Sequence, residues 1–313
     1  MKTQQPRWER TVLEQIAMQG LLEQRRLRRW KIFFRLAWLS VLLVILYHIF
    51  YYHTASALHS TAPFTAVIDL KETIDSDHDT ANKLVAGIEA ALDNPNTRGV
   101  IIHANSPGGS PVQAGIAFDG IRKLKQQYPK IPIYTVVEDM CTSGCYYIAC
   151  ATDKIYVDKA SIIGSIGVVS DGFGFVDIMK KLGIERRLQT AGDNKVINDP
   201  FSPQNPKHQA VIKTLLDHIH QQFIQAVKIG RGNRLKKDQA LFSGQIYLGN
   251  KGCQLGLADG MGNIRSIAED VIKTKQLRNF TVQEPLMDRL AKTWGVQSDT
   301  QLFNKLLHTL SIR

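Results

Sequence analysis

A run of apolar residues near the N-terminus constrains the organisation of this 313-residue chain more than any other feature. Between Leu36 and Tyr52, only Ser40 and His48 are clearly polar. A helix of these 17 residues is about 25 Å long, which is close to the roughly 30 Å hydrocarbon core of a bilayer. We therefore expect a membrane-spanning helix over residues 36–52 rather than a buried core helix.

The positive charge of the chain is concentrated in front of this run. The sequence holds 39 Lys and Arg against 28 Asp and Glu, a net charge of +11. Residues 1–35 carry nine of the basic residues and three of the acidic ones, so about half of the excess lies there. By the positive-inside rule, this distribution predicts a cytoplasmic N-terminus and an exported remainder. With no nucleic-acid-binding motif in the sequence, the charge is read as a signal of topology, and no nucleic-acid partner is expected.

A cleaved signal peptide is the alternative to an uncleaved anchor. Ala55-Ser56-Ala57 fits the small-residue pattern of a cleavage site. The basic region before the apolar run is about 35 residues long, however, and the run itself exceeds the usual 7–15 residues. These lengths favour an anchor that remains on the protein.

From Phe64 onward, short β-branched runs alternate with helical patterns. We expect strands over 64–70, 99–103, 131–137 and 154–157, and a long amphipathic helix over 208–229. Strands that alternate with helices indicate βαβ crossovers and a mainly parallel sheet. The fold class is therefore α/β.

Two turns are expected at carboxyl ends of strands, where open parallel sheets bind their ligands. One is the glycine-rich turn that contains Gly108 and Gly109, after strand 99–103, and the other is Cys141–Tyr147, after strand 131–137. In the second turn Ser143 is expected to open a helix, where free backbone N–H groups could stabilise an oxyanion. Either turn could also be purely structural, because Ser at a helix N-cap and Gly in a βα turn are common.

A serine nucleophile needs a base, and the usual base is missing near Ser143. No histidine lies between His103 and His208, and no Gly-x-Ser-x-Gly elbow surrounds the serine. A lysine kept neutral by loss of water is the other known solution. Composition alone does not choose among the lysines.

Three collinear segments carry a resemblance to a known family. They are SPGGS, then EDMCTSGCYYIACATDKIYVDKASIIGSIGVV, then TAGDNKVINDPFSP. Over residues 64–262 the chain resembles the signal peptide peptidase A (SppA) and SohB family of Ser–Lys peptidases, in particular its short, membrane-anchored members. The resemblance implies a Clp/crotonase-like parallel ββα superhelix.

The same resemblance assigns roles to individual residues. Ser143 matches the nucleophile of the family, Lys195 the general base, and Ser165 the serine that hydrogen-bonds the lysine. The N–H groups of Gly109 and Gly144 are expected to form the oxyanion hole. No metal site and no cofactor are expected.

The sequence departs from the family at Cys145, since the family usually has Ser-Gly-Gly or Ser-Ala-Gly before the tyrosines. Cys141, Cys145 and Cys150 surround the nucleophile in sequence, and they could pair or remain thiols. A cysteine nucleophile is a further alternative, which the lack of a nearby histidine disfavours.

The resemblance implies a serine endopeptidase of the bacterial inner membrane, with a periplasmic catalytic domain. Expected partners are the lipid bilayer, peptide substrates such as signal peptides or membrane-protein fragments, and further copies of the chain in a ring or dome, where neighbouring protomers can supply the serine and the lysine. Alternatives are a crotonase-like acyl-transfer enzyme and a non-catalytic membrane scaffold.

The expected segments are a cytoplasmic region 1–35, the anchor 36–52, a linker 53–63, a peptidase domain 64–277 and an extension 278–313.

Overall fold

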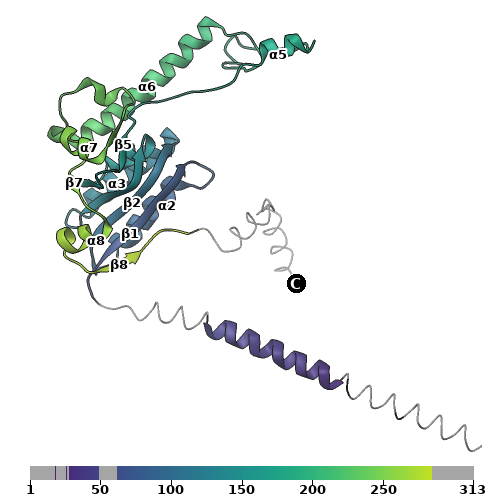
Figure 1. The fold of residues 1–313 in the computed structure, drawn as a ribbon, viewed down its shortest axis with the longest axis vertical. Coiled ribbons are helices and arrows are strands. Elements are labelled where there is room, and N and C mark those ends of the chain that lie inside the picture. The colour runs from purple at the N-terminus through teal and green to yellow at the C-terminus, as the bar shows by residue number, and fades with distance from the viewer. Residues whose placement is uncertain (1–17, 19–25, 27, 49–61, 284–313) are drawn as a thin grey trace, which may run out of the picture. The chain divides into compact units, whose positions relative to one another are not determined.

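The structure is a computed structural model that describes residues 18, 26, 28–48 and 62–283 (Figure 1). The N-terminal helix Arg28–His48 has a mean hydropathy of 1.8 and is long and apolar enough to cross a membrane, and none of it is buried. The expected span lies within this helix as far as His48. Residues 49–52, the candidate cleavage site at 55–57 and residues 284–313 of the expected extension lie outside the described residues.

The second part of the chain, from residue 62, is built on one sheet. Its strands are β1 (Phe64–Ile74), β2 (Thr97–Gly109), β3 (Ile133–Thr142), β4 (Lys154–Val157), β5 (Ile162–Gly164), β6 (Ile246–Leu248), β7 (Gly260–Met261) and β8 (Gln276–Asn279). The order is β6-β5-β3-β2-β1-β8, and β4 joins β3 to β7. Every pairing is parallel except that of β5 with β6. The expected α/β class with a mainly parallel sheet is confirmed.

Helices cover the two faces of the sheet unequally. The main core lies between the sheet and α2 (Thr80–Leu92), α3 (Pro111–Gln127), α4 (Gly144–Ala149) and the end of α6 (Pro206–Arg231). On the other face, α8 (Ile264–Ser266) and η3 (Ile267–Ile272) cover a small second cluster around Ile101 and Val136. Strand residues alternate between the clusters, since neighbouring side chains on a strand point to opposite faces. The remaining elements are α5 (Val176–Lys181), α7 (Gly249–Leu255), η1 (Gly232–Arg234) and η2 (Gln239–Phe242).

Strand β2 is longer than the sequence predicts. The expected strand ends at His103 and is followed by a glycine-rich turn, whereas β2 continues through Gly109. The expectation of a turn is wrong because pairing with β1 resumes after a register shift and extends to Ile74 opposite Gly109. Gly108 and Gly109 have φ angles of 98° and 150°, which glycine tolerates and other residues avoid.

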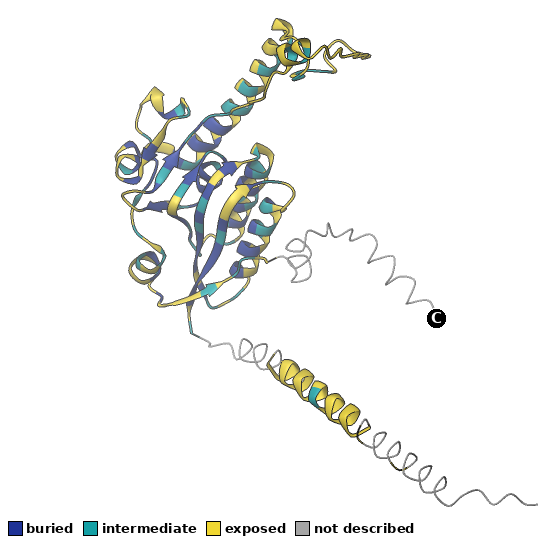
Figure 2. Ribbon diagram, turned by 45° about the vertical axis from the view of Figure 1, so that its right-hand side comes forward, coloured by how far each residue is buried: buried dark blue, intermediate teal, exposed yellow. Residues whose placement is uncertain are grey.

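Helix α6 differs between its two halves. The C-terminal end of α6 is mostly buried and the rest of the helix is exposed or half-buried (Figure 2). Phe223 and Val227 lie buried in the core, whereas Leu215 near the middle of the helix is exposed. We call residues 170–222 the arm; it comprises α5 with its flanking loops and the exposed part of α6. No residue of the arm is buried. The arm therefore gains little from the core that holds the rest of this part of the chain.

Candidate active site

The ends of β2 and β3 bring the two motifs of the sequence together. A Cβ atom placed on Gly108 would lie 2.6 Å from the backbone nitrogen of Gly144 and 2.8 Å from Cβ of Ser143. A Cβ atom on Gly144 would lie 3.2 Å from the backbone nitrogen of Gly109. Only glycine therefore allows the two backbones to approach so closely, and this approach places the amides of Gly109 and Gly144 beside Ser143.

Ser143 has an unusual backbone conformation. It precedes α4 as its N-cap residue with φ 53° and ψ −123°, and its side chain makes no capping hydrogen bond. The expectation that Ser143 opens a helix is confirmed, but the hydroxyl does not perform the structural task that a serine at this position usually has. A non-glycine residue with positive φ costs about 1–3 kcal/mol, and such residues cluster at functional sites.

A cavity of about 810 Å³ contains most of the expected site residues. Ser143, Ser165, Gly109 and Gly144 all contribute to its lining. Ser165 also has a positive φ, 51°, and its amide donates to the carbonyl oxygen of Gln245 at 2.9 Å. Two of the serines that line one cavity are thus held in a backbone conformation that serine rarely adopts.

Aromatic and aliphatic side chains form the wall of this cavity. Tyr147 stacks on Phe223 of α6 with ring centroids 5.0 Å apart, and both residues line the cavity. The adjacent Tyr146 instead points into the core, where its hydroxyl donates to the carbonyl oxygen of Leu257 at 2.8 Å. The sequence reasoning missed Tyr147 and Phe223 as wall residues, although Phe223 lies within the amphipathic helix expected over 208–229.

His220 was also missed as a residue near the site. Its Nε2 atom lies 3.0 Å from the carbonyl oxygen of Ile166, the residue that follows Ser165. This contact ties α6 to the segment that carries Ser165. His220 is not among the residues that line the cavity.

Lys195 lies apart from the other expected site residues. It is exposed on the arm, and it does not line the cavity that contains Ser143. Its amide donates to the carbonyl oxygen of Gly192 at 3.1 Å, and the nearby Asp193 carbonyl oxygen lies 3.1 Å from Nε2 of His208 on α6. A single copy of the chain therefore unites four of the five residues and leaves the lysine outside.

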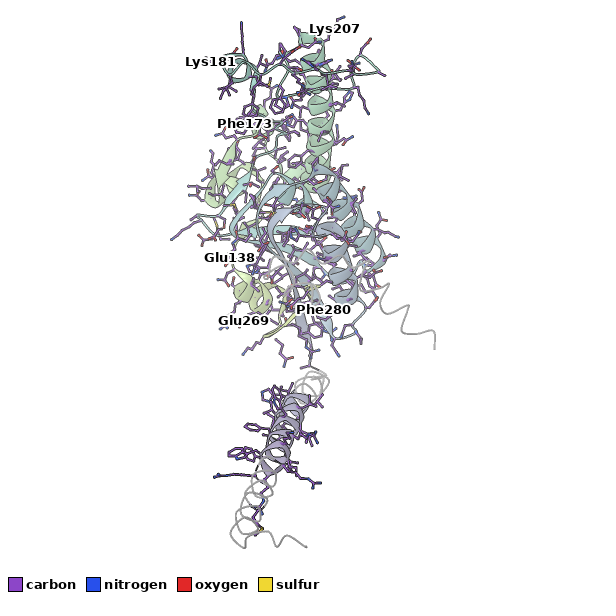
Figure 3. All side chains as sticks on the ribbon, turned by 90° about the vertical axis from the view of Figure 1, so that its right-hand side faces the viewer. Glu138, Phe173, Lys181, Lys207, Glu269 and Phe280 are labelled. Carbon is purple, nitrogen blue, oxygen red and sulfur yellow. A yellow bond between two sulfur atoms is a disulfide. The ribbon has the colours of Figure 1, made fainter. Side chains whose placement is uncertain are left out.

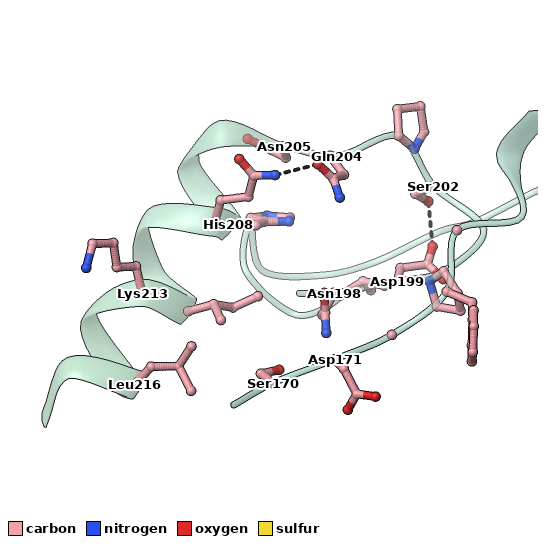
Figure 4. Close-up of a pocket in the computed structure, with 18 of the residues that line it drawn as sticks. Ser170, Asp171, Asn198, Asp199, Ser202, Gln204, Asn205, His208, Lys213 and Leu216 are labelled. Atoms are coloured by element: carbon pink, nitrogen blue, oxygen red, sulfur yellow. Dashed lines mark hydrogen bonds between the residues drawn. The ribbon is translucent and has the colours of Figure 1, made fainter. Parts of the chain in front are cut away.

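A second cavity, of about 1120 Å³, lies on the arm (Figure 4). Polar groups such as Asn198, Gln204 and His208 line it together with apolar residues, among them Leu216. Most of its polar groups are bonded within the arm, as in the hydrogen bond from Ser202 to Asp199 and that from Gln209 to Gln204. These bonds hold the arm together and do not converge on a point where a ligand would bind.

The cysteines near Ser143 are excluded as nucleophiles. Cys141 and Cys145 form a disulfide, which leaves neither as a thiol. Burial raises the pKa of the Cys150 thiol to about 12, so this thiol stays protonated at neutral pH. Among these residues, Ser143 is left as the candidate nucleophile.

Comparison with known proteins gives a family match. Residues 125–278 match the model of Peptidase family S49. The putative signal peptide peptidase SppA of Enterococcus faecium is 30% identical over 199 residues, which cover 63% of this chain and 57% of that protein. The probable protease SohB of Haemophilus influenzae is 28% identical over 214 residues, which cover 68% of this chain and 59% of that protein.

A third relative carries an unrelated name. The Na⁺/H⁺ antiporter NhaA of Brucella abortus is 41% identical over 215 residues, which cover 68% of this chain but only 29% of that protein. The chain spans less than two thirds of the length of each of these relatives. Secondary transporters are built from repeated sets of membrane-spanning helices, whereas the described residues of this chain contain one helix that could span a membrane. The similarity concerns one segment of a longer protein and gives no argument for ion exchange.

Proposed function

Because residues 125–278 match peptidase family S49 and the chain is similar to SppA and SohB proteins, we propose that it is a serine peptidase whose nucleophile is Ser143. One observation supports this most strongly. Ser143 has a strained backbone and no capping role, and it lies in a cavity beside the amides of Gly109 and Gly144. These are the parts that acyl transfer requires: a nucleophile, and donors for the oxygen that becomes negative.

The proposed reaction proceeds through an acyl-enzyme. The Oγ atom of Ser143 attacks the peptide carbonyl while Lys195 accepts its proton. The N–H groups of Gly109 and Gly144 donate to the oxyanion, and the lysine returns the proton to the leaving amine. Water then attacks the ester in the same way, and Ser143 regains its proton. Ser165 hydrogen-bonds the lysine amine and orients it.

The lysine is proposed to come from a neighbouring copy of the chain. A lysine acts as a base only when neutral, a form that loss of water favours, yet Lys195 is exposed in the single chain. The arm also exposes large apolar side chains, with Phe173 at 80%, Leu182 at 67% and Leu215 at 55%. A second copy that covers these side chains would bury the lysine and complete the site. In a closed ring, every copy would receive the lysine of its neighbour in this way.

We propose that the protein is anchored in the bacterial inner membrane and cleaves apolar peptides, such as spent signal peptides, at its outer face. The apolar helix Arg28–His48 follows a basic segment, an order that favours an exported catalytic domain. The aromatic and aliphatic cavity wall suits apolar substrate side chains.

Mixing two inactive variants tests the complete proposal. Ser143→Ala and Lys195→Ala should each abolish peptide hydrolysis, and Lys181→Ala, which changes another exposed lysine of the arm, should leave it intact. When the two inactive proteins are mixed in detergent, activity should return, because an intact serine can meet an intact lysine at some interfaces. If Lys195→Ala alone keeps wild-type activity, the proposed base is wrong. If the mixture stays inactive while each variant is folded and assembled, the pairing across copies is wrong.

One observation keeps an acyl-transfer enzyme as a second candidate. Such an enzyme needs a carboxylate at the site, and Asp119 of α3 is the one carboxylate among the residues that line the cavity. Two measurements separate the candidates. A serine-reactive phosphonate should label Ser143 of a peptidase, whereas an acyl-transfer enzyme should bind coenzyme A measurably in calorimetry.

A further inference from the structure

A disulfide encloses the proposed nucleophile. Cys141 lies near the end of β3 and Cys145 lies in the first turn of α4, with their Cα atoms 5.1 Å apart. The three residues between the bridged cysteines are Thr142, Ser143 and Gly144, so the short loop contains both the nucleophile and one proposed oxyanion donor. Both cysteine side chains are fully enclosed in the main core, which places the bridge beneath the site rather than in the path of a substrate.

The loop needs external restraint, because the conformation of Ser143 is unfavourable in isolation. A positive φ at a non-glycine residue persists only where the surrounding structure enforces it. Two backbone hydrogen bonds of 3.0 Å contribute, from the amide of Ser143 to Gly164 and from the amide of Tyr147 to Ser143. The hydroxyl of Thr142 adds a third bond of 3.0 Å to the carbonyl oxygen of Pro107.

Only one of these bonds, the one that Tyr147 donates to the carbonyl oxygen of Ser143, holds the peptide between Ser143 and Gly144. Glycine has the widest conformational freedom of any residue, and α4 has only six residues, so it contributes little rigidity of its own. A rotation of the peptide between Ser143 and Gly144 would turn the N–H of Gly144 away from the cavity. The disulfide restricts this rotation, because it joins the residues on both sides of the loop.

We propose that the Cys141–Cys145 disulfide is a positioning element that holds Ser143 and the amide of Gly144 in the geometry for attack. This inference rests on the proposed peptidase function and adds to it a dependence on an oxidised bridge. Because exported compartments are oxidising, the bridge forms where the catalytic domain is proposed to work. The two electrons and two protons of the cysteine thiols pass to a disulfide-carrying oxidant, which is reduced to a dithiol.

The size of the loop separates this role from general stabilisation. A disulfide stabilises a fold mainly by restricting the unfolded chain, and this effect grows with the length of the closed loop. A bridge that spans three residues restricts the unfolded chain less than one that closes a long loop, while it directly fixes the geometry of those three residues. Loss of the bridge should therefore lower the rate of the chemical step in protein that is still folded at the assay temperature.

The other two cysteines provide the controls. Cys150 is buried, and its raised pKa keeps it from exchanging with the bridge, because exchange requires a thiolate. Cys253 is a partly exposed free thiol. Cys253→Ser removes a sulfur without touching the loop, and it is the matched control for the bridge variants.

The experiment uses the full chain in detergent and measures both peptide hydrolysis and the rate at which a phosphonate labels Ser143. Cys145→Ser keeps the side-chain volume but not the bond, and it should lower kcat and the labelling rate by roughly 10–100-fold, with KM little changed. Cys141→Ser and the double variant should lose as much and no more, since each removes the same bond. Cys253→Ser should match the wild type. Alkylation of the denatured, unreduced wild type should modify two of its four cysteines.

Several outcomes would overturn the inference, and they differ from a failure of the proposed function. Bridge variants that label at the wild-type rate, or four alkylated cysteines in active wild type, would exclude the positioning role. Should the variants not fold, folded wild type is treated with dithiothreitol, which transfers two electrons and two protons to the bridge and closes to a cyclic disulfide. Full activity with four modified thiols would then overturn the inference, and a loss that reoxidation reverses would support it. Wild type that neither labels nor hydrolyses peptides would contradict the peptidase function itself.

Discussion

The sheet body, which is the part of residues 62–283 outside the arm, carries Ser143, and the arm carries Lys195. The two regions are stabilised in different ways. In the body, Ser143 lies between β3 and α4 and is fixed by backbone hydrogen bonds and a disulfide. The arm, on which Phe173, Lys181 and Lys207 lie, has no buried residue (Figure 3). The comparison teaches that one copy of the chain preorganises the nucleophile and the oxyanion donors but not the base.

Charged groups follow the same division. In the body, Nη1 of the buried Arg231 lies 2.7 Å from Asp259, and the same carboxylate also binds Arg234 at 2.9 Å and the amide of Ile155 at 2.7 Å. On the arm, the pair between Lys213 and Asp217 is exposed on both sides. Exposed ion pairs contribute little to stability, whereas removing one partner of a buried pair is strongly destabilising because it leaves an uncompensated charge in the interior.

The largest expected effect comes from adding one methyl group at the end of β2. In Gly109→Ala the new Cβ would overlap the carbonyl oxygen of Ile74, at a φ of 150° that alanine resists. The strand must shift, and the proposed donor of the oxyanion hole moves with it. We expect kcat/KM to fall by at least about 10²–10³-fold, the usual loss for one such donor.

The arm offers the matched control for this change. A Cβ atom on Gly174 would meet nothing within 4 Å. Gly174→Ala should therefore change the free energy of unfolding by less than about 0.5 kcal/mol and keep kcat/KM within about twofold. Equal losses in the two variants would contradict the division between body and arm.

The next largest effect concerns Asp259. Asp259→Asn leaves the charge of Arg231 buried without its partner and should cost about 3–5 kcal/mol of stability. Asp217→Asn, in the exposed pair of the arm, should cost no more than about 0.5 kcal/mol. Chemical denaturation of both variants at neutral pH measures the difference. A loss below about 1 kcal/mol in Asp259→Asn would show that the buried pair does not stabilise the body.

The dependence of stability on pH gives a second measurement of the contribution of Asp259. Burial raises the pKa of Asp259, but the hydrogen bond and the charge of Arg231 outweigh burial and hold the pKa below its usual value. A lowered pKa means that this contribution is complete above the unfolded value of about 4 and is lost as pH falls through the folded one. Wild type should lose stability below about pH 4. Asp259→Asn should lack that part of the slope, and an identical acid slope in both proteins would contradict this assignment.

The two halves of α6 give a smaller contrast. Phe223 is 4% exposed and stacks on Tyr147, so Phe223→Ala should cost about 3–5 kcal/mol at most and open the cavity wall. Leu215→Ala, two turns earlier on the same helix, removes a side chain that is 55% exposed and should cost under about 0.5 kcal/mol. Thermal unfolding of both variants measures the contrast. If Leu215→Ala lowered Tm as much as Phe223→Ala does, the side chain of Leu215 would have to be packed in the core as well.

Local patterns predicted most of the body. Short β-branched runs located the strands that became β1 to β4, and the amphipathic pattern over 208–229 located most of α6. The length of β2 was not predictable, because a strand that continues through Pro107 and two glycines depends on pairing with β1 after a register shift. Its local sequence is that of a turn.

The site was predictable as a set of residue types but not as an arrangement. The resemblance identified Ser143, Ser165 and the two glycines, and all four line one cavity. Three neighbouring cysteines allow several pairings, and only the path of the chain at the end of β3 selects Cys141 with Cys145. The place of Lys195 on an exposed arm follows from tertiary packing, which leaves no trace in the motif around it.

The smallest expected change in stability belongs to the arm, and it separates two explanations of the exposed apolar surface. Phe173 is 80% exposed and its ring centroid lies 6.4 Å from that of Phe175, so Phe173→Ser removes little packing within one copy, and Tm should stay within about 1 °C when the protein is too dilute to assemble. If copies meet through the arm, the same variant should need a higher protein concentration to reach half of its maximal specific activity. Wild type and Phe173→Ser, assayed over a dilution series in detergent, should then differ in that midpoint while their activities converge at high concentration. Overlapping curves would mean that Phe173 takes no part in the contact between copies, and a large fall in Tm at high dilution would mean that it packs within its own chain.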